Sequence, residues 1–430
     1  MNKLSLNTII KEKDQIQFDY HVSDGIKKYF SNTPFIIEYP DNIEKVPDSI
    51  AAIPFVCNVL PIIWVTDTEL RITELDKAFY ETIPGIKQAY QRMYPETKFK
   101  GKIIVEKIVE NHFENAGKSA MFYSGGLDSA QTLISHLEDK PTLLAIWGSD
   151  IRYDNKEGWR LVENVISNTA RQYGLQKAVI HSTFREFDNE ALLNSDFSQT
   201  LKDDWWHGIK HSLALLGHIA PYVWKHRINT MYIAASFCMQ DGKVRCASDP
   251  SIDNQVKFSD CQIVHDGYKY SRQDKIHNLV EFRKKSNRYF QLHVCWQSQE
   301  GNNCCMCEKC YRTMAGIWAE GENPENYGFS RAYKALDLMR LYIINNAETY
   351  SYALRYQWSY IQKRAVENKK LLCTKDYYKK FRWVLTANFA HPEKLKLPVQ
   401  YRIRAVMSHY KFYKYLHKVK MILLKREKNE

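Results

Sequence analysis

The sequence lacks any long, uninterrupted hydrophobic run. Its most apolar stretch, Ser49 to Val65, is broken by Pro54, Asn58 and Pro61. Because a membrane-spanning helix needs about 20 predominantly apolar residues, we expect no transmembrane segment and interpret this stretch as buried strands. Charges interrupt the first residues of the chain and no small-residue cleavage site follows them. We therefore expect no secretory signal and a cytoplasmic location.

Several signatures of common protein classes are also missing. The chain has no internal repeat and no low-complexity tract, it does not begin with a cysteine nucleophile, and no Gly-Lys-Ser/Thr triplet closes a Walker loop. No convincing Ser-His-Asp arrangement indicates a hydrolase. The 430 residues are 44% hydrophobic and 26% charged. This composition is typical of a folded soluble protein, and the length predicts two or three domains.

Acidic residues are scarce in the last quarter of the chain. Residues 331–430 contain 23 Lys and Arg but only 7 Asp and Glu, a net charge of +16, whereas the whole chain carries +12. Such a basic block suits a polyanion, either RNA or an anionic membrane surface, or forms a solvated helical face. Near the end, apolar residues recur at helical spacing, which predicts a helix that lies on a membrane surface or packs on the protein. They are Phe412, Leu416, Val419 and Leu423.

Three regions differ in pattern. Residues 1–112 combine short β-like runs with one helical stretch, which predicts an α+β module of unknown role. In residues 113–319, short apolar runs alternate with amphipathic helical ones. This alternation predicts an α/β domain with a doubly wound parallel sheet. Residues 320–430 are aromatic, basic and helical in pattern, and we expect a helical region there.

One hexapeptide stands between an apolar run and an amphipathic run in the central region. It consists of Ser124, Gly125, Gly126, Leu127, Asp128 and Ser129. Glycines let a backbone approach a ligand closely, and the amides and dipole of a helix N-terminus favour phosphate oxygens. A turn that merely starts a helix is the simpler interpretation, but the context of strand, turn and helix favours a phosphate loop. Asp128 is expected to be either a Mg²⁺ partner or a helix cap.

A cysteine-rich stretch lies further along the chain. Cys295, Cys304, Cys307 and Cys310 follow the spacing C-x8-C-x2-C-x2-C. Four thiolates this close together suit one tetrahedral zinc ion, with an iron–sulfur cluster as the alternative. Cys305 is predicted to be the spare cysteine, because using it in place of Cys304 would leave a cramped C-x-C step.

The hexapeptide resembles the SGGxDS loop of the PP-loop ATP pyrophosphatase superfamily, whose adenine nucleotide alpha hydrolase-like members split ATP between the α and β phosphates. Together with the four downstream cysteines, it resembles 7-cyano-7-deazaguanine synthase, and the resemblance covers about Met121 to Thr313. It implies Mg²⁺ and ATP as cofactors, a zinc site, and a carboxylate substrate of the 7-deazaguanine type that is adenylated for attack by ammonia or an amine. Family versions with extra domains are associated with antiviral defence.

The resemblance implies further site residues. Lys275 stands where the family has a lysine that approaches the phosphates, so we expect it to be catalytic together with Asp128, with Arg272 as a second choice in ATP binding. Asp249 stands near the family's substrate loop, in a departing Ser-Asp-Pro order. His207 is a second candidate for substrate binding, although a packed histidine is an alternative.

Two features of the same region rest on pattern alone. Asp150 follows a strand end, where open α/β sheets bind ligands, although a solvated loop aspartate is an equal alternative. The triplet from His265 to Gly267 is interpreted as a turn.

Two other functions remain open on the sequence. The first is a tRNA-modifying PP-loop enzyme that acts by thiolation or base activation and uses the basic C-terminal region to hold RNA. The second is a non-catalytic ATP-binding adaptor that docks through its basic tail. A protein partner would also account for the regions outside the resemblance.

Overall fold

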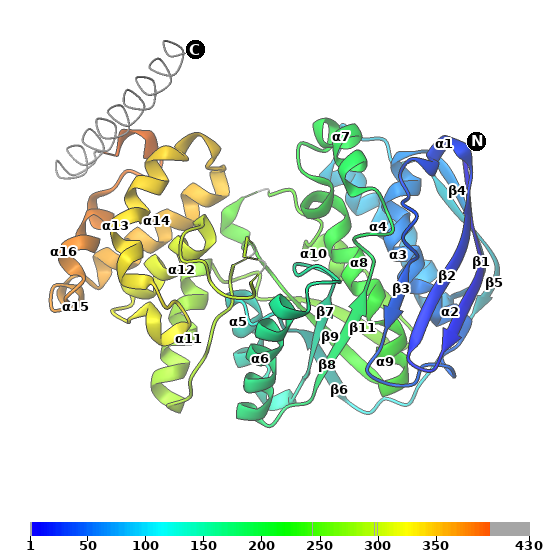
Figure 1. Ribbon diagram of the computed structural model, residues 1–430, viewed down its shortest axis with the longest axis horizontal. Helices are drawn as coiled ribbons and strands as arrows, with labels where there is room; N and C mark the ends of the chain where they lie inside the picture. The colour runs from blue at the N-terminus through cyan, green and yellow to red at the C-terminus, as the bar shows by residue number, and fades with distance from the viewer. Residues whose placement is uncertain (1, 243, 296, 299, 396–430) are drawn as a thin grey trace, which may run out of the picture.

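The computed structural model describes residues 2–242, 244–295, 297–298 and 300–395. Eleven strands form one mixed sheet in the order β10-β11-β9-β6-β7-β8-β3-β2-β1-β4-β5 (Figure 1). The N-terminal strands stand at one end of the molecule and the C-terminal helices at the other. The protein is thus an α/β protein with a large, mostly parallel sheet.

The central strands form a doubly wound parallel unit. They are β6 (Lys118–Phe122), β7 (Thr142–Trp147), β8 (Lys177–Ser182), β9 (Ile228–Ala234) and β11 (Cys261–Asp266), with the short β10 (Lys257–Phe258) antiparallel at the edge. The chain starts at β6, moves outward to β7 and β8, and then returns to the other side of β6 with β9 and β11. The direction of winding therefore reverses between β6 and β9. In open α/β sheets, ligands bind outside the carboxyl ends of the strands at such a switch point.

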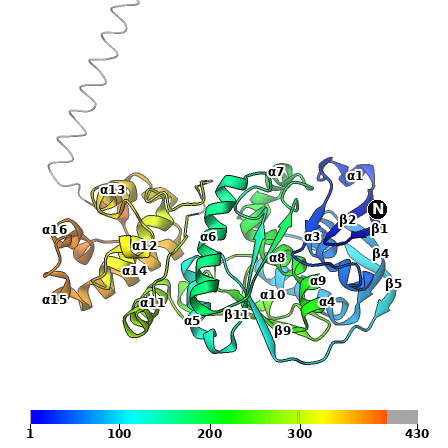
Figure 2. The same ribbon diagram turned by 60° about the horizontal axis from the view of Figure 1, so that its bottom comes forward.

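Helices cover both faces of this unit (Figure 2). On one face lie α5 (Leu127–Ser135), α6 (Lys156–Tyr173) and α11 (Arg272–Ser286), and on the other α7 (Glu190–Leu201), α8 (His211–His218) and α9 (Ala220–His226). Apolar residues of the two sets belong to two separate hydrophobic clusters. The sheet separates them because its central strands bury both faces, as parallel strands do.

The N-terminal residues extend the same sheet. Their strands are β1 (Asn2–Glu12), β2 (Gln15–Val22), β3 (Ile36–Glu38), β4 (Thr68–Asp76) and β5 (Lys102–Val109), and their helices are α1 (Asp24–Lys27), α2 (Asp48–Ala51), α3 (Ile53–Val65) and α4 (Lys77–Met93). β3 pairs antiparallel with β8, so the hydrogen-bonded ladder passes from residues 1–112 into the central unit. The parallel sheet predicted for residues 113–319 is therefore found in β6, β7, β8, β9 and β11, as the central part of a larger mixed sheet in which β1, β4 and β5 also pair in parallel.

The interpretation of residues 49–65 as buried strands is wrong, because this stretch forms α2 and α3. All but the last residue of α3 are buried, so the apolar pattern is continuous and has no period that distinguishes a helix from a strand. Pro54 lies in the first turn of α3, where a missing N–H costs nothing. Inside the core, the side-chain nitrogen of Asn58 donates a hydrogen bond to the Pro54 carbonyl at 2.8 Å.

The C-terminal region is helical, as predicted. It contains α13 (Ala332–Asn345), α14 (Tyr352–Glu367), α15 (Lys369–Leu372) and α16 (Tyr378–Phe381). Two further helices, α10 (Pro250–Asp253) and α12 (Glu308–Ala319), belong to residues 113–319. The predicted apolar stripe between Phe412 and Leu423 lies outside the described residues. Within the described part of the chain, no helix is long and apolar enough to cross a membrane.

Candidate functional site

The predicted phosphate loop follows β6 directly and opens α5, at the switch point of the sheet. Gly125 has a φ of +74°, and a Cβ built there would lie 2.7 Å from a side-chain methyl of Val165. Only glycine meets both conditions without strain. No side chain caps α5 at its N-cap residue, Gly126, so amides of its first turn are left for a ligand or solvent. Leu127 is buried in the core, so only its backbone can face a ligand.

The loop hydroxyls are held within the loop. Ser124 Oγ accepts a hydrogen bond from the Gly126 N–H at 3.3 Å, and Ser129 Oγ donates to the Gly126 carbonyl at 3.1 Å. Both bonds hold the turn in its open shape. They are also weak enough in geometry to be exchanged for bonds to a bound anion.

Asp128 lies between two cationic side chains from α11. Lys275 Nζ lies 3.0 Å from Oδ1 of Asp128, and Arg272 Nη1 lies 3.3 Å from Oδ2. Lys275 also donates to the carbonyl of Ala235, just after β9, so its ammonium bridges the ends of β6 and β9. Arg272 donates to Thr313 Oγ1 at 3.0 Å, and its buried Nε has no hydrogen-bond partner among the described residues.

These contacts set the charge of the Asp128 carboxylate. Burial by itself would raise its pKa, but the charges of Lys275 and Arg272 outweigh burial and lower the pKa to about 2. Asp128 is therefore ionised at neutral pH. It is the second residue of α5 and does not cap the helix, so the helix-cap interpretation is wrong.

The start of α11 is defined by its own sequence. Ser271 and Asp274 form a capping box, in which each side chain accepts a hydrogen bond from the other residue's backbone N–H. The helix therefore begins at Arg272. Since Arg272 and Lys275 are three residues apart, they lie on the same face, and that face meets the loop.

Two further cations, Lys309 and Arg312 on α12, were missed by sequence reasoning. Both lie close enough to Arg272 and Asp128 for the charges of these two residues to affect their pKa values. Burial lowers the pKa of Lys309, the Arg272 charge lowers it further, and the charges of Asp128 and Asp150 oppose that change. The sequence feature that could have indicated them is the motif C-E-K-C-Y-R at residues 307–312, in which these two cations stand beside two of the clustered cysteines.

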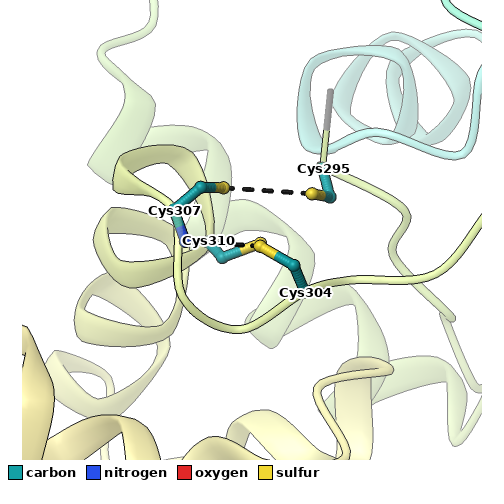
Figure 3. Close-up of side chains that lie close together, drawn as sticks. All are labelled: Cys295, Cys304, Cys307 and Cys310. Atoms are coloured by element: carbon teal, nitrogen blue, oxygen red, sulfur yellow. Dashed lines mark hydrogen bonds between the residues drawn. The ribbon is translucent and has the colours of Figure 1, made fainter. Parts of the chain in front are cut away.

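The four predicted cysteines form a compact cluster, with all their sulfur atoms within 4.8 Å of one another. Figure 3 shows them converging from two segments, Cys295 on one side and the other three on the loop and first turn of α12. The Cys295–Cys307 and Cys304–Cys310 sulfur pairs are each separated by 3.9 Å. Four sulfurs about 2.3 Å from one zinc ion stand about 3.8 Å apart, so the cluster has the dimensions of a tetrahedral zinc site.

The surroundings of the cluster also suit a thiolate site. The backbone N–H groups of Met306 and Cys307 point at Cys304 Sγ, at 3.4 and 3.3 Å, and such donors stabilise a charged sulfur. Cys305 is outside the cluster, as predicted, and its thiol faces the Asn303 carbonyl. Cys307 is the N-cap residue of α12, so a metal bound here would hold the helix start that carries Lys309.

His293 connects the cluster to the loop. Its backbone N–H donates to the Gly125 carbonyl at 2.7 Å, two residues before Cys295. Burial lowers the pKa of His293, as it does that of Lys309, and Asp150, which follows β7, lies close enough to both for its charge to oppose the change. The structure therefore places Asp150 near Lys309 and near His293, whose backbone contacts the hexapeptide at Gly125.

Asp249 and His207, the two predicted substrate-binding residues, both lie close to Ala247. Asp249 caps α10 by accepting hydrogen bonds from the N–H and hydroxyl of Ser251, and it lines a cavity of about 600 Å³. His207 pairs with Asp203 at 2.7 Å, and its carbonyl accepts from the Ala247 N–H. Burial opposes the charge of His207, but hydrogen bonds with Asp203 and Cys246 raise its pKa to about 11. Cys246 lines the same cavity.

Comparison with known proteins yields no match: no family model, no curated protein and no solved structure is similar to this chain.

Proposed function

We propose that the protein is an ATP-dependent, AMP- and pyrophosphate-forming enzyme of the PP-loop type that adenylates a carboxylate. One observation carries the proposal. An uncapped helix start on a glycine turn and the buried cations Arg272 and Lys275 meet at the switch point of a doubly wound sheet. Backbone amides and cations together in a partly buried site favour a polyphosphate, and the switch point is where such sheets bind nucleotides.

The proposed reaction uses this arrangement electrostatically. The β and γ phosphates of Mg-ATP bind at residues 124–129, and the substrate carboxylate attacks the α phosphorus. Lys275 and Arg272 then offset the negative charge that develops on the departing pyrophosphate, because preorganised cations cost no reorganisation during the reaction. Lys309 and Arg312 extend the same positive surface from α12. The product is an acyl adenylate, which ammonia or an amine converts into an amide and AMP.

A zinc ion would have a structural role in this scheme. Cys295, Cys304, Cys307 and Cys310 would supply four thiolates and leave no open position for a substrate, so the ion would act as a cross-link and not as a Lewis acid. It would join the segment after His293 to the start of α12. The positions of Lys309 and Arg312 would then depend on the metal.

A carboxylic acid of the 7-deazaguanine type is the substrate we propose, on the resemblance of the loop and cysteines to 7-cyano-7-deazaguanine synthase. The cavity lined by Asp249 has room for a ligand of this size, since its volume of about 600 Å³ lies within the range typical of small-molecule sites. Its wall contains the aromatic side chains of Phe237 and Tyr268, against which a planar ring can pack.

The test is release of AMP and pyrophosphate from Mg-ATP with 7-carboxy-7-deazaguanine, with and without ammonium chloride. We expect AMP formation that requires the acid and is lost in Lys275→Ala. The control is Lys284→Ala, which removes from the same helix an exposed lysine that pairs with Glu281. ATP binding without AMP formation would contradict the proposed substrate. Turnover that instead required tRNA would favour the tRNA-modifying alternative, and binding without turnover on any substrate would favour the adaptor.

A further inference from the structure

The cavity that Asp249 lines is built by segments from two parts of the chain. Residues of α4 form one wall, and the chain after β9 and β11 forms the other. Its lining residues include Arg92, Phe237, Cys246, Asp249, His265 and Tyr268. The lining segments adjoin β9 and β11, and β9 pairs with β6, whose carboxyl end carries the loop that we propose binds ATP.

A buried histidine–aspartate pair stands at this cavity. His265 Nδ1 lies 2.7 Å from Oδ2 of Asp253, whose side chain is fully buried. The Asp253 carboxylate also accepts hydrogen bonds from the hydroxyls of Ser212 and Ser248. The interpretation of residues 265–267 as a turn is therefore wrong, because His265 belongs to β11 and its side chain is held by α10.

This pairing determines which ring nitrogen carries the proton. An ionised carboxylate only accepts hydrogen bonds, so Nδ1 of His265 must donate to Asp253. In the neutral imidazole, Nε2 is then the basic nitrogen with a free lone pair. No described residue forms a hydrogen bond with Nε2, and this atom is not among the buried polar atoms that lack a partner. His265 lines the cavity, and its side chain is 2% exposed.

The His265 pair is also close to the proposed ATP site. Asp266, the next residue of β11, accepts at its carbonyl from the Ala235 N–H at 2.8 Å, and the Ala235 carbonyl accepts from Lys275. A Cβ placed on Gly267 would lie 3.9 Å from Cε of Lys275. Lys275 thus bonds to Asp128 and to Ala235, and Ala235 is itself bonded to Asp266, the residue after His265.

We propose that His265 is the general base of the second half-reaction, with Asp253 as its positioning residue. The proposal rests on the proposed function. The nitrogen lone pair of ammonia or an amine attacks the acyl carbon of the adenylate, and a C–N bond forms. The bond from the acyl carbon to the phosphate oxygen breaks, and AMP leaves with the bonding electrons. His265 Nε2 takes the proton that the nitrogen loses and passes it to solvent. Adenylation releases no such proton, so only the second half-reaction needs the base.

The variant His265→Asn tests this role. The asparagine amide can donate to Asp253 where Nδ1 did, but no group replaces Nε2. Adenylation is measured as pyrophosphate–ATP exchange with 7-carboxy-7-deazaguanine, and amide formation is measured by mass spectrometry with ammonium chloride. We expect exchange within about twofold of the wild type and amide formation slower by about 10² to 10⁴-fold, the range for loss of a general base. Added imidazole is expected to restore part of the rate.

Two further variants complete the test. His226→Asn is the matched control, because His226 also pairs with a carboxylate, Asp41 at 2.8 Å, but does not line the cavity. Both of its reactions should be unchanged. Asp253→Asn should slow amide formation with exchange retained, because an amide no longer enforces a proton on Nδ1, and imidazole should not rescue it, because the ring of His265 still occupies its place.

The outcomes separate the two proposals. Absence of exchange in the wild type would refute the proposed adenylation itself. If the wild type shows exchange and His265→Asn forms the amide as fast as the wild type, the proposed role of His265 as general base would be refuted. Equal loss of both reactions in His265→Asn and His265→Gln, measured at a temperature where both remain folded, would assign the residue to substrate binding and also overturn it.

Discussion

Replacing Lys275 should weaken ATP binding, and loss of its ion pair with the buried Asp128 should also lower the stability of the fold. In the structure its ammonium has two partners, the Asp128 carboxylate at 3.0 Å and the Ala235 carbonyl, and its side chain is only 2% exposed. A hydrogen bond to a charged group contributes about 1.5 to 3 kcal/mol. Since 1.4 kcal/mol corresponds to a factor of ten, Lys275→Met should raise the Kd for ATP by about 10- to 150-fold. Methionine preserves most of the buried stem, so packing is largely retained.

The assay is calorimetric titration with Mg-ATP, accompanied by a thermal melt. Lys284→Met is the control, because it removes a lysine of α11 that is half exposed and pairs with Glu281. Its Kd should change by less than twofold, as expected for a surface pair. A second comparison uses Asp128→Asn, which frees both cations and should tighten binding of pyrophosphate without Mg²⁺. Equal Kd values for Lys275→Met and Lys284→Met would refute the assignment of this cluster to phosphate binding.

Three other predictions concern the metal, the loop and the carboxylate. Elemental analysis should find one zinc per chain in the wild type and in Cys305→Ser but less in Cys304→Ser; equal loss in both variants would contradict the four-cysteine assignment. Gly125→Ala should lower the melting temperature more than Gly174→Ala, because both glycines have positive φ but only the first would place its Cβ against a neighbour, a valine of α6. The pKa of Asp128 is lowered from 3.8 to about 2, so its ion pairs stabilise the fold above pH 4 by about 2 kcal/mol, and this contribution should disappear as the pH falls to 2. Melts of the wild type and Asp128→Asn should therefore converge over that range, and a constant difference would count against the ion pairs.

The sequence predicted structure correctly where a single short segment contains the whole motif. The apolar runs of the central region form β6 to β9, and the hexapeptide lies between a strand and a helix as predicted. The cysteine cluster was predictable because three of its members lie within seven residues, which keeps their sulfur atoms close in any fold. Residues 49–65 were misassigned because a segment that is buried on all sides loses the polar face that reveals a helix.

Contacts between distant segments could not be predicted in this way. The sequence does not indicate that β3 pairs with β8 and joins the N-terminal strands to the sheet. Nor does it indicate that α4 forms a wall of the cavity. In the sequence, Lys309 and Arg312 resemble ordinary surface cations, because only the position of α12 shows that they lie near Asp128. Likewise, the sequence does not show that Asp253 pairs with His265.

The sequence alone thus determined the local elements of the central region and the chemistry of two motifs, because turn glycines, capping residues and cysteine spacing act over a few residues. Only the tertiary structure decided which cations face Asp128, which histidine has a buried carboxylate partner, and where the cavity lies. Those features depend on strand order and helix packing, which bring together residues more than 100 positions apart, such as Asp128 and Lys275.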